Sequence, residues 1–224
     1  MNNKENIERF ESLLRATGRR NIDVLLDRLQ QTDLYSAPSS TRFHLSVPGG
    51  LLQHSLNVYD ALKELLKDNN DGTFSVMVAG QPVETVTEDS ISISALLHDV
   101  CKVNVYQTSK RWRKDDQNRW EQYDTYEFDD PEPFGHGEKS VWLLSRIIRL
   151  KPAEAYAIRF HMGAAAEKEE RTFWNAVSKH PFVFSLHAAD VFASQLMEEN
   201  GENAARFRPA PAPDSDDAEQ EVIL

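Results

Sequence analysis

The chain has 224 residues, of which 40% are hydrophobic and 27% are charged, a balance typical of a globular protein with one good-sized domain. Its net charge of −11 disfavours a partner such as extended duplex DNA, because a surface that covers duplex DNA must be basic. The single cysteine, Cys101, excludes an internal disulfide, and no apolar run has the length of a signal peptide core or a spanning helix, so we expect a cytoplasmic protein without a membrane partner.

The first part of the chain predicts structure rather than chemistry. Residues 4–34 show apolar residues at helical spacing on both sides of Gly18, which predicts two helices that pack on a core. Residues 36–50 are rich in serine, proline and glycine and predict an irregular loop, in which His44 lies. This loop leads into the helix that carries the first candidate site residue.

His54 is that first candidate. It lies in a predicted helix from Leu51 to about Lys67, on the same side as the apolar Val58. A single histidine on an apolar face is more often a core residue than a metal ligand. Its meaning therefore depends on whether other polar side chains join it.

Two segments predict β-hairpins between the helices. Residues 69–88 form the first, and residues 105–128 form the second, with a turn centred near Asp116 that would place Trp112 opposite Trp120. The second hairpin is either a solvated hairpin with a cross-strand tryptophan pair or a lid that binds phosphate. The lid interpretation rests on its basic tip, which contains Lys110, Arg111, Arg113, Lys114 and Arg119.

The segment between the hairpins has the most unusual polar pair in the chain. Residues 91–102 predict an apolar helix capped by Asp89 or Ser90, and His98 and Asp99 lie side by side within it. A histidine and a carboxylate are costly to bury unless they are hydrogen-bonded, paired or bound to a metal. The pair therefore predicts a partner, which could be a cation.

Three further helices are predicted over 135–150, 153–163 and 181–199. His136 opens the first helix, His161 closes the second, and Asp190 lies in the third among large apolar residues. His187, one turn before Asp190, is interpreted as a residue that supports the ligands or packs beside them, rather than as a ligand itself. The chain ends in an acidic tail, 201–224, that we expect to be disordered.

The candidate residues together form a set that suits a metal centre. Four imidazoles and two carboxylates favour divalent transition metals, and their wide spacing predicts a site built inside a helical bundle. The residues are His54, His98, Asp99, His136, His161 and Asp190.

The order of these residues resembles the HD-domain metal-dependent phosphohydrolase superfamily, whose signature is H…HD…D. The blocks GGLLQHSLNV, ALLHDVCK, GHGEKS and LHAAD, within about residues 36–195, are similar to the HD domain of bacterial 3′–5′ exoribonucleases that also carry an OB-fold module. The resemblance implies an all-α HD-domain helical bundle with inserted β-hairpins around 73–88 and 105–128. We expect N-terminal helices over 1–35, the HD domain over 36–200 and the tail over 201–224.

The resemblance also implies roles for single residues. The first metal ion would be bound by His54, His98, Asp99 and Asp190, and a second by Asp99, His136 and His161. Met162 stands where some two-metal members carry a further histidine, so the second site has three protein ligands. Asp99 and Lys102 would be catalytic, with Lys102 against the substrate phosphate. The metal is left open among Mn, Fe, Ni, Co, Zn and Mg.

The expected function is hydrolysis of a phosphomonoester or phosphodiester, in a nucleotide or a short nucleic-acid end, by a metal-activated water. Lys102 and the second hairpin would contact this substrate, the hairpin through Lys110, Arg111, Trp112, Arg113 and Trp120. Two alternatives remain: a 3′–5′ exonuclease on single-stranded RNA or DNA, although no OB module is found in the sequence, and a non-catalytic, metal-stabilised HD regulatory module. Cys101 is interpreted as a core residue rather than a nucleophile.

Overall fold

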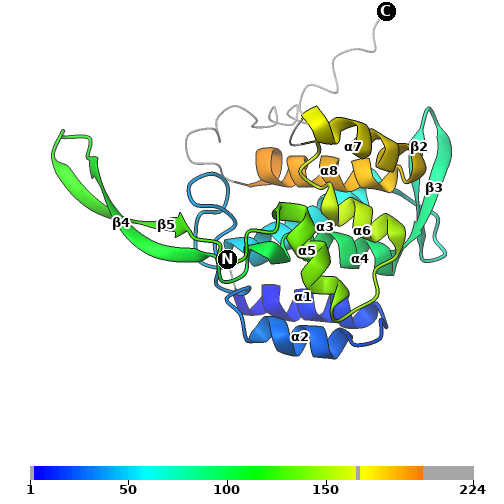
Figure 1. Ribbon diagram of the computed structural model, residues 1–224, viewed down its shortest axis with the longest axis horizontal. Helices are drawn as coiled ribbons and strands as arrows, with labels where there is room; N and C mark the ends of the chain where they lie inside the picture. The colour runs from blue at the N-terminus through cyan, green and yellow to red at the C-terminus, as the bar shows by residue number, and fades with distance from the viewer. Residues whose placement is uncertain (1–2, 165–166, 199–224) are drawn as a thin grey trace, which may run out of the picture.

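The computed structural model describes residues 3–164 and 167–198, so the predicted tail, 201–224, lies outside the described residues. Within the described residues, eight α-helices and two small antiparallel sheets form a helix-rich, mixed fold (Figure 1). The all-α prediction was therefore too narrow, although both predicted hairpins are present. No described helix is both long and apolar enough to cross a membrane.

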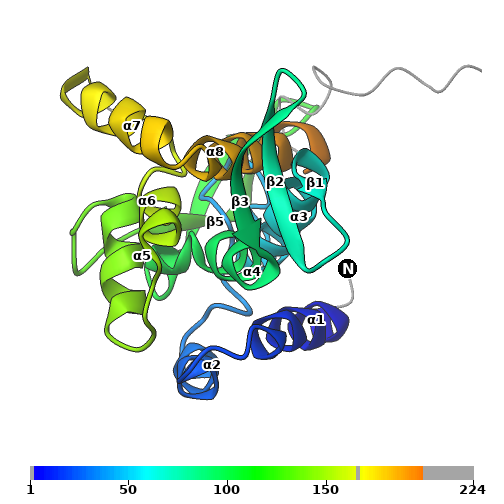
Figure 2. The same ribbon diagram turned by 90° about the vertical axis from the view of Figure 1, so that its right-hand side faces the viewer.

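The two predicted N-terminal helices are confirmed as α1 (Asn3–Ala16) and α2 (Ile22–Gln30). They lie along the lower edge of the molecule in Figures 1 and 2 and bury apolar side chains such as Phe10 and Leu26 against the core. Val24, also in α2, is 47% exposed. These helices cover the core and contribute no residue to the candidate site.

The core is built by four helices: α3 (Gly50–Leu65), α4 (Glu88–Leu97), α6 (Pro152–Arg159) and α8 (Phe182–Phe192). Helix α3 contacts α4 and α8, and α6 contacts the same two helices. All described side chains of α4 from Ser90 to Leu97 are buried, as expected for a helix enclosed by others. The polar residues of the candidate site therefore lie in a low-dielectric interior.

The first predicted hairpin is confirmed as β2 (Thr73–Val78) and β3 (Gln81–Thr87), joined by a third short strand, β1 (Lys67–Asp68). Strand β3 contacts α4, and Figure 2 shows the sheet over the core helices. This sheet leads directly into α4. It positions the start of that helix, where Thr87 is the N-cap in place of the predicted Asp89 or Ser90.

The second hairpin, β4 (Tyr106–Lys114) and β5 (Trp120–Phe128), forms a long arm that projects from the body (Figure 1). Its register places Trp112 opposite Gln122 and Trp120 opposite Lys114, so the predicted Trp112–Trp120 pair was wrong. The turn has five residues centred on Gln117, because the Asp115 carboxylate accepts hydrogen bonds from backbone amides of the turn. The centre of the turn lies one residue later than predicted. The partner of each β4 residue is therefore two residues further along β5, so that Trp112 pairs with Gln122 instead of Trp120.

The remaining helices are α5 (His136–Ser145) and α7 (Glu167–Lys179). Helix α7 was not predicted, and α5 ends five residues earlier than predicted. Helix α8 is followed by a π-helical turn, Ala193–Met197, whereas the sequence indicated one continuous helix through residue 199. This turn places the last described residue, Glu198, beside the candidate site.

Candidate metal centre

The His98-Asp99 pair lies at a break in the chain rather than inside a helix. Helix α4 ends at Leu97, Asp99 has φ −105° and ψ 16°, and a 3₁₀ turn, Val100–Lys102, follows. The predicted helix through Lys102 was therefore too long. The break turns both side chains into the core, where His98 is fully buried and Asp99 is 2% exposed.

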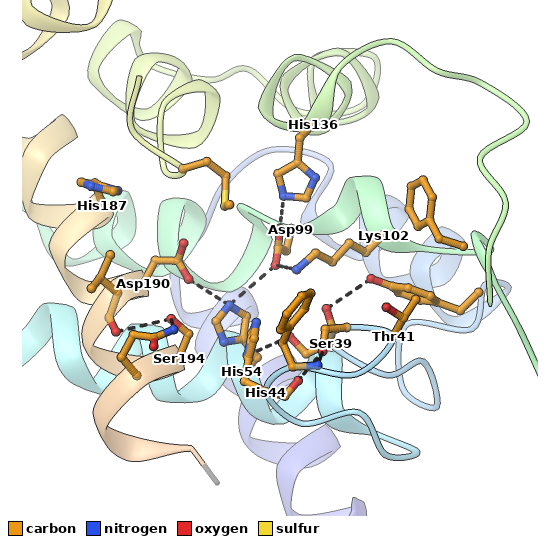
Figure 3. Close-up of a pocket in the computed structure, with 17 residues that line it drawn as sticks. Ser39, Thr41, His44, His54, Asp99, Lys102, His136, His187, Asp190 and Ser194 are labelled. Carbon is orange, nitrogen blue, oxygen red and sulfur yellow. Dashed lines mark hydrogen bonds and ion pairs between the residues drawn. The ribbon is translucent and has the colours of Figure 1, made fainter. Parts of the chain in front are cut away.

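Three imidazoles present the same ring nitrogen to a common space. His98 donates from Nδ1 to the Ala95 carbonyl oxygen at 2.8 Å, and His161 donates from Nδ1 to the Ile158 oxygen at 2.7 Å. The Nδ1 atom of His54 lies 2.8 Å from a carboxylate oxygen of Glu198. Because each Nδ1 is committed to an acceptor, each Nε2 is directed to the space around Asp99, as Figure 3 shows for His54.

One side of the Asp99 carboxylate gathers the first predicted ligand set. The Nε2 atom of His54 lies 3.1 Å from Asp190 Oδ1, 3.3 Å from His98 Nε2 and 3.6 Å from Asp99 Oδ2. The distance from His98 Nε2 to Asp99 Oδ2 is 3.4 Å. Three of the four expected donors, on His54, His98 and Asp190, form one group whose atoms all lie within 4.8 Å of one another, whereas Asp99 groups with His98 and His161 and also with Cys101 and His136.

The other side of the carboxylate gathers the second set. Asp99 Oδ1 lies 2.9 Å from His136 Nε2 and 3.3 Å from His161 Nε2. The two imidazoles meet because α5 begins against the end of α6: a Cβ on Gly137 would come within 2.1 Å of the Arg159 carbonyl oxygen. Only glycine permits this close approach.

The donor atoms fit a metal ion. Asp99 Oδ1 and His161 Nε2 are buried, and neither makes a hydrogen bond of good geometry in the described part of the chain; the nearest groups to the Asp99 oxygen are the ring nitrogens of His136, at 2.9 Å, and His161, at 3.3 Å. A buried carboxylate oxygen and a buried ring nitrogen that make no hydrogen bond lower the stability of the fold unless a cation binds to them. Ligands about 2.1 Å from one ion lie roughly 3.0 to 3.4 Å apart, close to the spacings found here. These groups could therefore hold a metal ion.

The electrostatics keep the carboxylates of the cluster ionised. Burial opposes ionisation of Asp99, but the Lys102 ammonium, 2.7 Å away, and the neighbouring imidazoles hold the pKa of Asp99 well below its ordinary value. Burial likewise opposes the charge on Asp190, whose pKa is nevertheless lowered by its hydrogen bond with His54. Despite burial, the bonds to Asp190 and Glu198 raise the pKa of His54 to about 10. A divalent cation would compete with the proton on this imidazole.

Cys101 lies against the second set. Its Sγ atom is 3.3 Å from His136 Nδ1, and burial together with the Asp99 charge raises the pKa of the thiol to about 12. The side chain is buried, and with Asp99 and His136 it also forms a group that could hold a metal ion. Its burial agrees with the prediction of a core cysteine.

The cluster opens into a pocket of about 650 Å³. Lys102, His136 and Asp190 line it, as do the loop before α3 and the base of the arm, through Tyr106 and Phe128. Met162 also lines the pocket. The pocket gives a substrate access to both ligand sets.

The tip of the arm does not line this pocket. The predicted substrate contacts Lys110, Arg111, Trp112, Arg113 and Trp120 all lie on the arm beyond its base. The three cations among them pair with carboxylates of β5 at 3.9, 3.6 and 2.6 Å. The predicted substrate contacts of the arm tip therefore stay a prediction, while Tyr106 and Phe128 were missed by sequence reasoning.

Two polar residues near the cluster were also given no role from the sequence. His44, in the loop before α3, lines the pocket, and Glu198 contacts both His44 and His54. His187, expected to support the ligands or pack beside them, donates from Nδ1 to the His161 carbonyl oxygen at 2.6 Å. No local pattern marks Glu198 as buried, because it is followed by another glutamate and then by an acidic tail.

No protein-family model matches the chain, and searches of curated proteins and of solved structures found no similar protein. The resemblance to the HD superfamily therefore stays a prediction from the order of the residues in the sequence. The structure shows a buried histidine and aspartate cluster that could bind a metal ion and is compatible with an HD-type site.

Proposed function

We propose that the protein is a metal-dependent phosphohydrolase of the HD type, which acts on a nucleotide or a short nucleic-acid end. One observation carries the proposal: the six residues predicted from the sequence lie together, five of them around the buried carboxylate of the sixth, Asp99, although they come from α3, α5, α8 and the ends of α4 and α6. Buried histidines that serve only packing have no reason to direct their Nε2 atoms to a common carboxylate.

The residues divide into two ligand sets that share Asp99. His54, His98, Asp99 and Asp190 would hold one ion, and Asp99, His136 and His161 the other. Such ions supply a water nucleophile that is deprotonated near neutral pH and neutralise charge on a phosphoryl group. The mixed imidazole and carboxylate set favours Mn, Fe, Co, Ni or Zn over Mg.

The protein's own groups would bind and orient the substrate. The Lys102 ammonium lines the pocket, and its pKa is raised by the nearby Asp99 charge despite burial, so it stays positive and can hold a phosphoryl oxygen. Phe43, Tyr106 and Phe128 line the same pocket and offer aromatic surface on which a base can stack. The net charge of −11 favours a small nucleotide over a long polymer, which most of the surface would repel.

The proposal is tested on purified protein by measuring its metal content and then assaying bis-p-nitrophenyl phosphate with added Mn²⁺ or Ni²⁺. We expect turnover that depends on the metal. A stoichiometrically filled site without turnover would contradict the enzyme and would indicate a metal-stabilised regulatory module.

A 3′–5′ exonuclease on single-stranded RNA or DNA is the second candidate function. It is favoured by the arm, where Trp112 and Trp120 are 62% and 65% exposed and could stack bases. A panel of nucleoside phosphates, cyclic nucleotides and short oligonucleotides separates the two. The first proposal predicts preference for the small nucleotides.

A further inference from the structure

Glu198 is a completely buried carboxylate beside the metal cluster. Its Oε2 atom lies 2.5 Å from His44 Nδ1, and its Oε1 atom lies 2.8 Å from His54 Nδ1. Asn57 also donates to Oε1, at 3.0 Å. A buried carboxylate needs such donors, but core packing alone does not require that two of them be imidazoles lining the same pocket.

His54 is held from both ring nitrogens by carboxylates from one stretch of chain. Asp190 lies 3.1 Å from its Nε2, and Glu198 lies 2.8 Å from its Nδ1. A histidine whose Nδ1–H is bound by a carboxylate has its Nε2 lone pair free and its ring direction fixed. This is the arrangement that a metal-binding imidazole requires.

The π-helical turn after α8 makes this arrangement possible. In an uninterrupted α-helix, Glu198 would lie about 80° around the helix axis from Asp190. The turn at Ala193–Met197 takes up one extra residue, so Glu198 takes the place of the seventh residue after Asp190, about 20° away. Both carboxylates therefore face α3 and reach His54.

We propose that Glu198 is a positioning residue for the first metal site. Glu198 accepts a hydrogen bond from Nδ1–H of His54 and so directs the Nε2 atom of His54 to the ion. Its other carboxylate oxygen holds His44 in the wall of the pocket. The inference rests on the proposed metal site. It adds a residue that touches neither metal nor substrate.

The wild-type protein provides a test that needs no variant at the site. In ¹⁵N-labelled protein loaded with Zn²⁺, long-range ¹H–¹⁵N spectra report which nitrogen of each imidazole carries a proton. We expect His54 to be protonated at Nδ1 and bound to Zn²⁺ through Nε2, with its signals identified by their loss in His54→Asn. Zn²⁺ on Nδ1 of His54 would overturn the proposal.

Variants then measure the contribution of Glu198, with Zn²⁺ and Mn²⁺ affinities determined by calorimetry. We expect Glu198→Ala to bind the metal about 10- to 100-fold more weakly, and Glu198→Gln, whose amide oxygen still accepts from Nδ1, to recover part of that loss. The matched control is Glu154→Gln, at a fully buried glutamate that pairs with Arg19. This control should keep wild-type metal affinity.

Separate outcomes identify which claim fails. Wild-type affinity in a folded Glu198→Ala protein would overturn the role of Glu198 and leave the metal site standing. If Glu198→Ala does not fold, Glu198→Gln provides the test. A Glu198→Gln protein that binds the metal with wild-type affinity although its His54 spectrum is altered would also overturn the positioning role of Glu198. Wild-type protein that binds neither ion would overturn the metal site itself.

Discussion

Asp99 Oδ1 and His161 Nε2 lie 3.3 Å apart, and neither atom makes a hydrogen bond within the described residues, although both are buried. Folding normally places a donor beside such atoms, because an unsatisfied polar atom in the core costs roughly 1 to 3 kcal/mol. Both atoms belong to a group that could hold a metal ion, which would satisfy them. The following predictions depend on this relationship and on the groups around it.

Metal binding should stabilise the folded protein, because the ligand atoms are assembled only in the native state. At a free metal concentration about 100 times the dissociation constant, the expected gain is about 2.7 kcal/mol in the free energy of unfolding. Thermal unfolding with Mn²⁺, and again after removal of the metal with a chelator, measures it. A midpoint that does not change with saturating metal would contradict the buried site.

Lys102→Ala should lower kcat/KM by about 100-fold while the bound metal is retained, because Lys102 contacts the substrate phosphate in the proposed mechanism. Lys102→Arg should recover part of the activity, since the charge is kept. Metal content and phosphodiester hydrolysis are measured on the same preparations. Unchanged kcat/KM in Lys102→Ala would refute the assigned role.

The arm offers a test of substrate size. If the tip of the arm binds a polymer, replacing four basic residues of strand β4 by glutamine should reduce the hydrolysis of oligonucleotides more than the hydrolysis of bis-p-nitrophenyl phosphate. The cations are Lys110, Arg111, Arg113 and Lys114. Fully retained oligonucleotide activity would show that the tip is not a nucleic-acid-binding lid.

Asp89 predicts a pH-dependent contribution to stability far from the metal cluster. Burial opposes its charge, but hydrogen bonds from Thr87 and Arg19, the latter at 2.6 Å, lower its pKa below the ordinary 3.8. The stabilisation is therefore present above pH 3.8 and is lost as the pH falls through the lower folded-state pKa. Urea denaturation should find Asp89→Asn about 1 kcal/mol less stable at pH 7, after allowance for solvent screening. The difference should shrink below about pH 3.8, and a constant difference down to pH 2 would contradict this ion pair.

The sequence predicted most of the helices and both hairpins because their apolar periodicity and turn residues are strong local signals. It also indicated six of the polar residues that meet, because a single buried charge among apolar residues would be costly, although His98, Asp99 and His161 lie just beyond helix ends rather than inside helices. The break after Leu97 could not be predicted, because residues 98–102 contain no proline or glycine. Tertiary contacts of Asp99 fix the chain direction there.

Glu198 shows the limit of local patterns most clearly. Its burial depends on a π-helical turn whose residues, Ala193–Met197, have the composition of an ordinary helix. The register of the arm was missed for a related reason, because the side chain of Asp115 selects a five-residue turn that spacing alone does not distinguish from a shorter one. In the π-helical turn and in the arm alike, a shift of one residue along the chain decides which side chains come into contact.

The most direct measurement is the metal content and activity of Asp99→Ala beside the wild-type protein, after equilibration with Mn²⁺ or Ni²⁺ and removal of free ions. Asp99 is the residue that both ligand sets share. Circular dichroism establishes that the variant is folded. We predict that the wild-type chain retains one or two ions and hydrolyses bis-p-nitrophenyl phosphate, while Asp99→Ala retains none and is inactive. An Asp99→Ala protein that still binds the metal and turns over the substrate would contradict the proposed centre.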